Sequence, residues 1–320
     1  MAPEKSAIKA VFPLSNTELA VVLTAPLAQD GIGGLRFSSK AGLKLKLART
    51  DTRNPARLVL KTNMRSDRVV VDQLTASGLM LDGTRRRVRA VGPAFVPGVQ
   101  DPSQLKLPHF NSSYPYASTL VGVHVTVACC TGCNGGVHDR DLVVLNHHVG
   151  GPWTGIWVRT SKTIDAPYPR WQKVRCAGGV ITEYRGSTTV VDEGWMEIQK
   201  LVEEPHHAPP PLSLSADDLQ NGKALLLKGL DASWVQFDGV RIQGAKTVQP
   251  TSGPARTLRL TRNEVTFTDG SGAQATAYLY QPTGLKLQEN QTLRQLRGFV
   301  HAEAPGRYVV LSDKEEDLIK

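Results

Sequence analysis

The chain has 320 residues, of which 40% are hydrophobic, 38 are Lys or Arg and 29 are Asp or Glu. This balance is typical of folded globular domains and excludes a disordered chain, a collagen and a coiled coil. The sequence contains no run of about 18 apolar residues, and Met1 is followed by polar residues rather than by an apolar stretch, so neither a membrane span nor a signal peptide is visible.

The net charge of +9 lies almost entirely in the first third of the chain. Residues 1–105 contain 16 basic and 8 acidic side chains, residues 106–210 contain 9 of each, and residues 211–320 contain 13 and 12. Cations that neutralise phosphates give sequence-independent affinity for nucleic acids. For the arginine run at 85–89 we favour a solvated basic turn, and a phosphate or polyanion patch is the alternative. The positions that could form a polyanion patch are Lys44, Lys46, Arg85, Arg86, Arg87 and Arg89.

Residues 1–91 predict a β-sandwich, because short apolar strand patterns are separated by turn residues. The predicted strands are 8–12, 19–23, 43–47, 57–60 and 68–71. In 43–47, leucines alternate with Lys44 and Lys46, which predicts one face in a core and a basic face in water. The stretch from Ile8 to Gly83, with Leu-Thr-Ala-Pro-Leu at 23–27, resembles the bacterial Ig-like domains that serve as spacers and adhesive modules. This resemblance implies no catalytic residue.

Two segments predict connections between domains. Residues 92–117 are rich in Pro, Ser and Asn, and residues 205–211 read Pro-His-His-Ala-Pro-Pro-Pro. The second segment predicts a stiff, extended linker, and we interpret His206 and His207 as solvated linker residues rather than metal ligands. The boundaries then leave two further domains, at 118–204 and 212–320.

Strand patterns recur in both of these domains. They lie at 120–127, 142–145, 155–158, 173–184, 222–226, 233–240, 265–270, 275–279, 293–300 and 308–311. A glycine pair at 178–179 bends the longest strand of the first set, as the closure of a small barrel requires.

Three stretches within 118–320 carry a resemblance. Gly-Ile-Trp-Val at 155–158, the run from Gly178 to Gly186 and the run from Asp231 to Val240 resemble the tandem OB-fold region of bacterial secreted nucleases and related exported proteins. The last run also resembles OB-type repeats in the sensor regions of some bacterial histidine kinases. In the nucleases, catalysis belongs to a separate metal-dependent domain, so the resemblance implies an accessory role without nuclease activity.

An OB barrel binds oligonucleotides or oligosaccharides through aromatic platforms and basic residues. The candidate ligand-binding residues are Trp153, Arg159, Tyr168, Arg170, Trp171, Lys173 and Arg175. A tryptophan on an alternating strand can instead belong to a core, which we expect for Trp157 and Trp234. The near neutrality of both domains argues against nucleic-acid binding by the barrels themselves.

The four cysteines, Cys129, Cys130, Cys133 and Cys176, allow three complete pairings. We favour a cross-strand bridge from Cys129 or Cys130 to Cys176 and a second bridge within the turn that ends at Cys133. A zinc site built from all four thiolates and a set of free thiols are the alternatives. The disulfides would imply an oxidising compartment.

Catalytic residue types gather only at His138, Asp139, Asp141, His147 and His148, and the chain lacks a GxSxG elbow, an HExxH motif and a P-loop. We interpret this cluster as a loop at a strand end, with a metal site at His138, Asp141, His147 or His148 as the alternative.

The sequence therefore predicts an all-β chain, an Ig-like β-sandwich followed by two OB-type β-barrels. The predicted function is a non-catalytic, exported binding or assembly module, located extracellularly or in a periplasm and without a cofactor. Its partners would be other proteins or surface polymers. The alternative is a protein that binds single-stranded nucleic acid or another polyanion.

Overall fold

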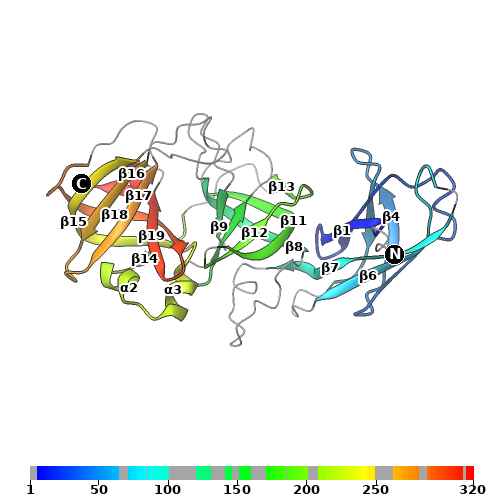
Figure 1. Cartoon of the computed structure of the whole chain (residues 1–320), viewed down its shortest axis with the longest axis horizontal. Helices are drawn as coiled ribbons and strands as arrows, with labels where there is room; N and C mark the ends of the chain where they lie inside the picture. Colours follow the sequence, from blue (N-terminus) through cyan, green and yellow to red (C-terminus); the bar gives the residue numbers. More distant parts are fainter. Residues whose placement is uncertain are drawn as a thin grey trace, which may run out of the picture.

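The structure is a computed structural model. It describes residues 6–64, 71–84, 86–100, 120–130, 141–145, 151–159, 171–184, 186–200, 208–248, 262–280, 287–312 and 315–320. Three β modules follow one another along the molecule, with the N-terminal module at one end and the C-terminal module at the other (Figure 1). The described helices are all too short to cross a membrane.

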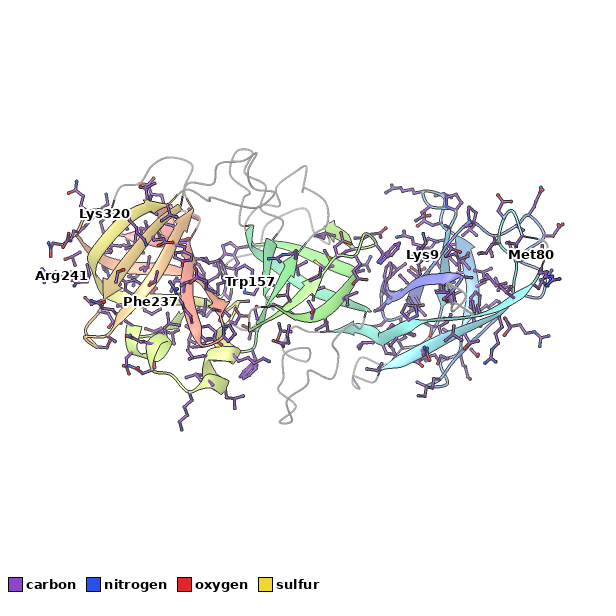
Figure 2. The ribbon with its side chains drawn as sticks, in the orientation of Figure 1. Lys9, Met80, Trp157, Phe237, Arg241 and Lys320 are labelled. Atoms are coloured by element: carbon purple, nitrogen blue, oxygen red, sulfur yellow. The ribbon has the colours of Figure 1, made fainter. Side chains whose placement is uncertain are left out.

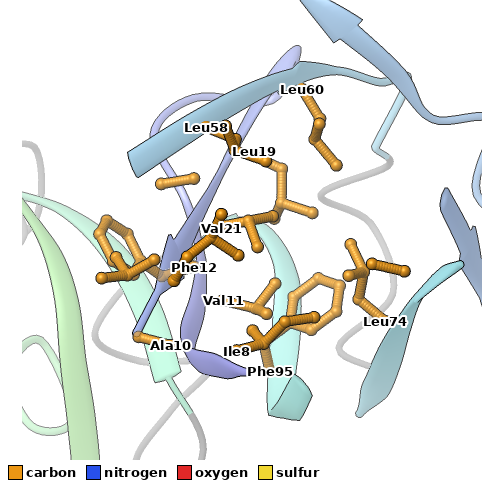
Figure 3. Packing of buried hydrophobic residues seen from close by; sticks show 14 of the residues in the cluster. Ile8, Ala10, Val11, Phe12, Leu19, Val21, Leu58, Leu60, Leu74 and Phe95 are labelled. Atoms are coloured by element: carbon orange, nitrogen blue, oxygen red, sulfur yellow. The ribbon is translucent and has the colours of Figure 1, made fainter. Parts of the chain in front are cut away.

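The first module, here the sandwich, packs two sheets face to face. One sheet has the antiparallel order β1-β2-β5-β4, and the facing strands follow the order β7-β6-β3. The strands are β1 (Ile8–Pro13), β2 (Glu18–Leu23), β3 (Arg36–Ser39), β4 (Lys46–Thr50), β5 (Arg57–Lys61), β6 (Asp72–Leu79) and β7 (Val88–Gln100). Val11, Leu58, Leu60, Leu74 and Phe95 fill the space between the sheets, as Figure 3 shows, and each is fully buried.

The strand predicted at 43–47 is displaced. Strand β4 begins only at Lys46, because the preceding chain bonds to side chains instead of to a neighbouring strand. The Leu43 amide donates to Ser39 Oγ at 2.8 Å and the Ala41 amide donates to Asp72 Oδ1 at 2.8 Å. The predicted alternation is nevertheless present, since the three leucines of 43–47 pack on the core while Lys44 and Lys46 are exposed.

The linker predicted at 92–117 begins too early. Strand β7 continues through Gln100, and it pairs antiparallel with β6 and then parallel with β8. The prolines at 93 and 97 suggested a connection, yet the ladder passes them with irregular registers on both sides. The sandwich and the next module therefore share a continuous sheet.

The second module, here the first barrel, contains β8 (Leu120–Cys130), β9 (Asp141–Leu145), β10 (Gly155–Arg159), β11 (Gln172–Tyr184) and β12 (Ser187–Val191). Their order is β8-β9-β10-β12-β11, and pairing of β11 with β8 closes the ring. Only the β10–β12 pair within this ring is parallel. Strand β13 (Glu197–Lys200) pairs antiparallel with the first part of β11.

The third module, here the second barrel, repeats this topology. Its strands are β15 (Trp234–Val248), β16 (Arg262–Thr268), β17 (Gln274–Tyr280), β18 (Thr292–Ala304) and β19 (Arg307–Ser312). The order is β15-β16-β17-β19-β18, with β17–β19 parallel and β15–β18 closing the ring. Short strands β14 (Leu212–Ser213) and β20 (Leu318–Ile319) flank it, beside a short 3₁₀ turn η2 (Glu315–Asp317). Five-stranded closed barrels of this order are OB folds, so the predicted fold class is confirmed.

The strand predicted at 222–226 is wrong, because this segment is helical. Helix α2 (Ala216–Gln220) begins with a capping box between Ser215 and Asp218, and helix α3 (Ala224–Leu230) follows. In α3, Leu227 and Leu230 are buried while Leu225 and Leu226 are exposed, which is a helical spacing rather than a strand alternation.

Candidate functional site

The sandwich packs directly on the first barrel. On the outer face of the β1-β2-β5-β4 sheet, Phe12 lies so close to Gly178 of β11 that a Cβ atom there would sit 3.2 Å from the ring. Ala177 and Val180 of the barrel belong to the same buried cluster as the sandwich core. The glycine at 178, which has a φ of +89°, is thus needed both for the bend of β11 and for this close approach.

Basic side chains line the edge of this contact. Lys46 lies opposite Lys61 in the β4–β5 pair, and Lys61 lies opposite Glu18 in the β2–β5 pair. Arg49 donates to Glu18 at 2.6 Å, and the charge of Arg175 on the first barrel also acts on this carboxylate. We call these cations, together with exposed Lys44 two residues before Lys46, the basic rim: Lys44, Lys46, Arg49, Lys61 and Arg175.

Three of these cations, Arg49, Lys61 and Arg175, act on the carboxylate of Glu18. The pKa of Glu18 is lowered from its ordinary value, mainly by the hydrogen bond from Arg49, while partial burial opposes the shift. Within the described residues, Lys44 and Lys46 are exposed and form no ion pair. The rim therefore keeps a strong positive excess toward solvent.

The neighbouring cations are already neutralised. The guanidinium of Arg57 binds both Asp51 and Glu197, and the second of these bonds crosses from the sandwich to the first barrel. The Lys9 ammonium lies 5.7 Å from the ring centre of Trp195, a cation–π contact across the same junction.

The predicted polyanion patch divides into two surfaces. Lys44 and Lys46 face outward from one sheet of the sandwich, whereas Arg89 faces outward from β7 in the other sheet. Arg87 is a structural residue, because its guanidinium donates to the backbone carbonyls of Gly33, Gly78 and Asp30. Arg86 is exposed, and Arg85 lies outside the described residues.

The predicted burial of Trp157 and Trp234 is correct, but the two rings lie between the barrels rather than inside them. Each is 4% exposed, and they share a cluster with Tyr278, Phe299 and Leu311. Figure 2 shows Trp157 on the side of the first barrel that faces the second, while Phe237 lies within the second barrel. Strand β10 and the first two residues of β15, Trp234 and Val235, are thus buried on both faces.

The two tryptophans predicted as stacking platforms belong to the same interface. The ring of Trp171 lies 5.5 Å from that of Trp234 and 6.3 Å from that of Phe299. Trp153 covers Gly229, where a Cβ atom would sit 2.6 Å from the indole, and its amide donates to the Gly229 carbonyl at 2.6 Å. Neither ring is therefore an open platform for a base or sugar.

The rest of the predicted ligand set does not converge on these tryptophans. Arg175 belongs to the basic rim, on the opposite side of the first barrel from the second barrel. Arg159 is half-buried, and its carbonyl accepts from the Asp192 amide. Tyr168 and Arg170 lie outside the described residues, as does the side chain of Lys173.

A buried carboxylate that sequence reasoning missed holds the two barrels together. Asp231 is 1% exposed, and its Oδ1 accepts from Trp157 Nε1 and from the Ala302 amide, both at 3.0 Å. Its Oδ2 accepts from the Ser187 hydroxyl at 2.5 Å. Lys228 adds an ion pair to Glu183 at 3.1 Å across the same interface. No spacing in the sequence distinguishes this aspartate from an ordinary turn residue.

The predicted bridge to Cys176 is wrong. Cys176 pairs with Val123 in the β8–β11 ladder, six positions before Cys129. At about 3.4 Å per residue the two Cα atoms are roughly 20 Å apart, whereas a disulfide needs them within about 7 Å. Cys176 is a free, buried thiol, and burial raises its pKa to about 12. The same separation removes Cys176 from a zinc site with Cys129, and Cys133 lies outside the described residues.

The predicted alternative metal site cannot be placed. His138, His147 and His148 lie outside the described residues, and Asp141 begins β9. Among the residues that are described, no three His, Cys, Asp or Glu side chains come together in a way that could hold a metal ion.

Comparisons with known proteins give little. The chain matches no protein-family model and no curated protein. A murine DNA-binding protein bound to double-stranded DNA is 12% identical, with 60% of this chain and 90% of that one covered and a TM-score of 0.30. The Ifi202 HINa domain in complex with 20 bp double-stranded DNA is 9% identical, with 61% and 94% covered and a TM-score of 0.29. The OB assignment rests on strand order and not on these low-scoring similarities.

Proposed function

We propose that this chain is a non-catalytic nucleic-acid-binding protein that contacts phosphates through its basic rim. The observation that carries the proposal is the row of Lys46, Lys61 and Glu18 across three paired strands, with Arg49 and Arg175 also acting on Glu18. Exposed Lys44 lies two residues before Lys46. Between residues 6 and 100 the described chain has 12 basic and 5 acidic side chains, an excess of seven. Such an excess attracts polyphosphates and releases their counterions.

The packing of the modules determines which surface remains available to contact a nucleic acid. The aromatic rings that could have stacked on bases are committed to the contact between the barrels. The barrels therefore serve as a rigid body, and the electrostatic contact falls to the sandwich and the adjoining face of β11. Binding of this kind is strong in low salt and tolerant of sequence.

Fluorescence anisotropy with labelled single-stranded DNA over a range of salt concentrations tests the proposal. Removing three phosphate contacts in a K44Q/K46Q/K61Q variant should reduce the slope of log K against log salt by about 2, since each contact contributes roughly 0.7 on a single strand. A K223Q/R294Q/K320Q variant makes the same change in charge at exposed positions of the second barrel and should keep the original slope.

The outcomes separate the possibilities. Equal slopes for the two variants would show that binding follows net charge and not the basic rim. Competition by heparin but not by DNA would assign the rim to another polyanion. Duplex DNA included beside the single strand shows which form is preferred.

Contact with other proteins or surface polymers, after export, stays a second proposal. The exposed side chains of Leu225 and Leu226, 47% and 40% accessible, favour it, because neighbouring apolar side chains on a surface helix suit a protein partner. Co-purification that persists in high salt and is lost in an L225Q/L226Q variant supports it, and unchanged co-purification refutes it.

A further inference from the structure

The second barrel contains a polar cavity. Its volume is about 180 Å³, and it lies where the end of α2 meets the beginnings of β17 and β19. The polar side chains on its wall are Gln220, Gln274, Thr276, Arg307 and Tyr308. The volume equals about six water molecules at liquid density and is smaller than the roughly 300–1,000 Å³ of pockets for drug-sized ligands. The cavity thus has room for one small ligand.

The wall offers many hydrogen bonds and one positive charge. Amides and hydroxyls both donate and accept, as the hydroxyl groups of a sugar do, and no carboxylate lines the cavity. Arg307 forms an ion pair with Glu303, with 2.9 Å between Nε and Oε2, and Tyr278 donates a hydrogen bond to Glu303 Oε1 at 2.5 Å. The Arg307 side chain is 64% exposed, and among the described residues its terminal nitrogens have no ion-pair partner.

The charges beside the cavity determine which kind of anion it suits. Glu303 already offsets part of the charge of Arg307, so the cavity suits a monoanionic carboxylate better than a phosphate dianion. Tyr308 stays a neutral hydroxyl, because burial, aided by the charges of Asp231 and Glu183, raises its pKa to about 12. The ring of Tyr308 adds an apolar wall of the kind on which a sugar ring can rest.

We propose that this cavity binds one acidic monosaccharide unit, with its carboxylate on Arg307 and its hydroxyls on Gln220, Gln274 and Thr276. The site goes beyond the proposed nucleic-acid contact. The cavity lies on α2, β17 and β19 of the second barrel, whereas the rim residues of β4, β5 and β11 lie where the sandwich meets the first barrel. Either site can therefore exist without the other.

Ligand-observed saturation-transfer NMR on the full chain tests the proposal with three probes: glucuronate, glucose and inorganic phosphate. We expect glucuronate to bind about tenfold more tightly than glucose, the least that one hydrogen bond to a charged group supplies. R307M should lower glucuronate affinity to the level of glucose, and T276V should weaken both sugars by a similar factor. R294M, at an exposed position outside the cavity, should change neither.

The controls keep the test decisive. Each variant is checked by its thermal midpoint, and Q274A at an exposed wall position replaces T276V if the latter unfolds early. No saturation transfer to either sugar, equal affinities for R307M and R294M, or displacement of glucuronate by millimolar phosphate would each overturn the assignment.

Discussion

Replacing Asp231 with alanine should weaken the contact between the two barrels and lower the free energy of unfolding. The substitution leaves the Trp157 and Ala302 N–H groups buried without an acceptor, and it removes the acceptor of the Ser187 hydroxyl. Each orphaned buried donor costs about 1–3 kcal/mol. The Ser187 hydroxyl can rotate toward another acceptor, so only the two N–H groups are counted. The loss in the free energy of unfolding is then roughly 2–6 kcal/mol.

Asp231→Asn is the matched control. Both N–H groups donate to Oδ1, which the asparagine carbonyl replaces, and the amide nitrogen at the Oδ2 position can donate to Ser187 Oγ. All three contacts are preserved, so the loss should stay near 1 kcal/mol, the charge-assisted part of the bonds.

Urea unfolding followed by tryptophan fluorescence measures both variants. Four of the five tryptophans, Trp153, Trp157, Trp171 and Trp234, lie at this interface, so their emission reports its opening. A D231A midpoint equal to that of D231N, or a D231A loss below about 1 kcal/mol, would refute the assignment of Asp231 as the buried acceptor that joins the barrels.

Two further predictions concern close packing. Gly229→Ala places a Cβ atom 2.6 Å from the Trp153 ring and should lower the urea midpoint by an amount equivalent to about 1–3 kcal/mol, whereas Gly244→Ala, with nothing within 4 Å, should lower it much less; equal midpoints contradict the contact. Because burial raises its pKa to about 12, the Cys176 thiol should stay protonated at pH 8 and react with a disulfide reagent only when the chain unfolds; prompt reaction in a variant whose other three cysteines are serine contradicts this.

The sequence predicted which residues share a face, but not what each face meets. Ile156, Trp157 and Val158 are consecutive apolar residues, and such a run is typical of a strand buried on both faces. This signal for a second packed surface was present, yet it could not indicate that the neighbour is the other barrel. The contact depends on how two closed sheets meet, which local periodicity does not encode.

Strand register and the distances between residues along a strand also could not be predicted from the sequence. Antiparallel pairing of the first and fourth barrel strands was correctly expected, but the cysteine bridge needed a register that only the folded ladder supplies. Similarly, Trp171 lies in the turn just before β11 and Arg175 lies within β11, four residues further on and at most about 13 Å away. Each side chain therefore reaches a different neighbouring module, although the sequence places them in one cluster.

Strand β7 also determines how the molecule responds to force. Because β7 is hydrogen-bonded to β6 of the sandwich and to β8 of the first barrel, bending at this joint must stretch ladder bonds instead of rotating a flexible connection. Pulling along the chain would load the parallel β7–β8 ladder in shear, with its hydrogen bonds sharing the tension. Together with the buried contact at Asp231, this makes the chain a stiff rod that holds the basic rim, at the junction of the sandwich and the first barrel, at a fixed distance from the polar cavity of the second barrel.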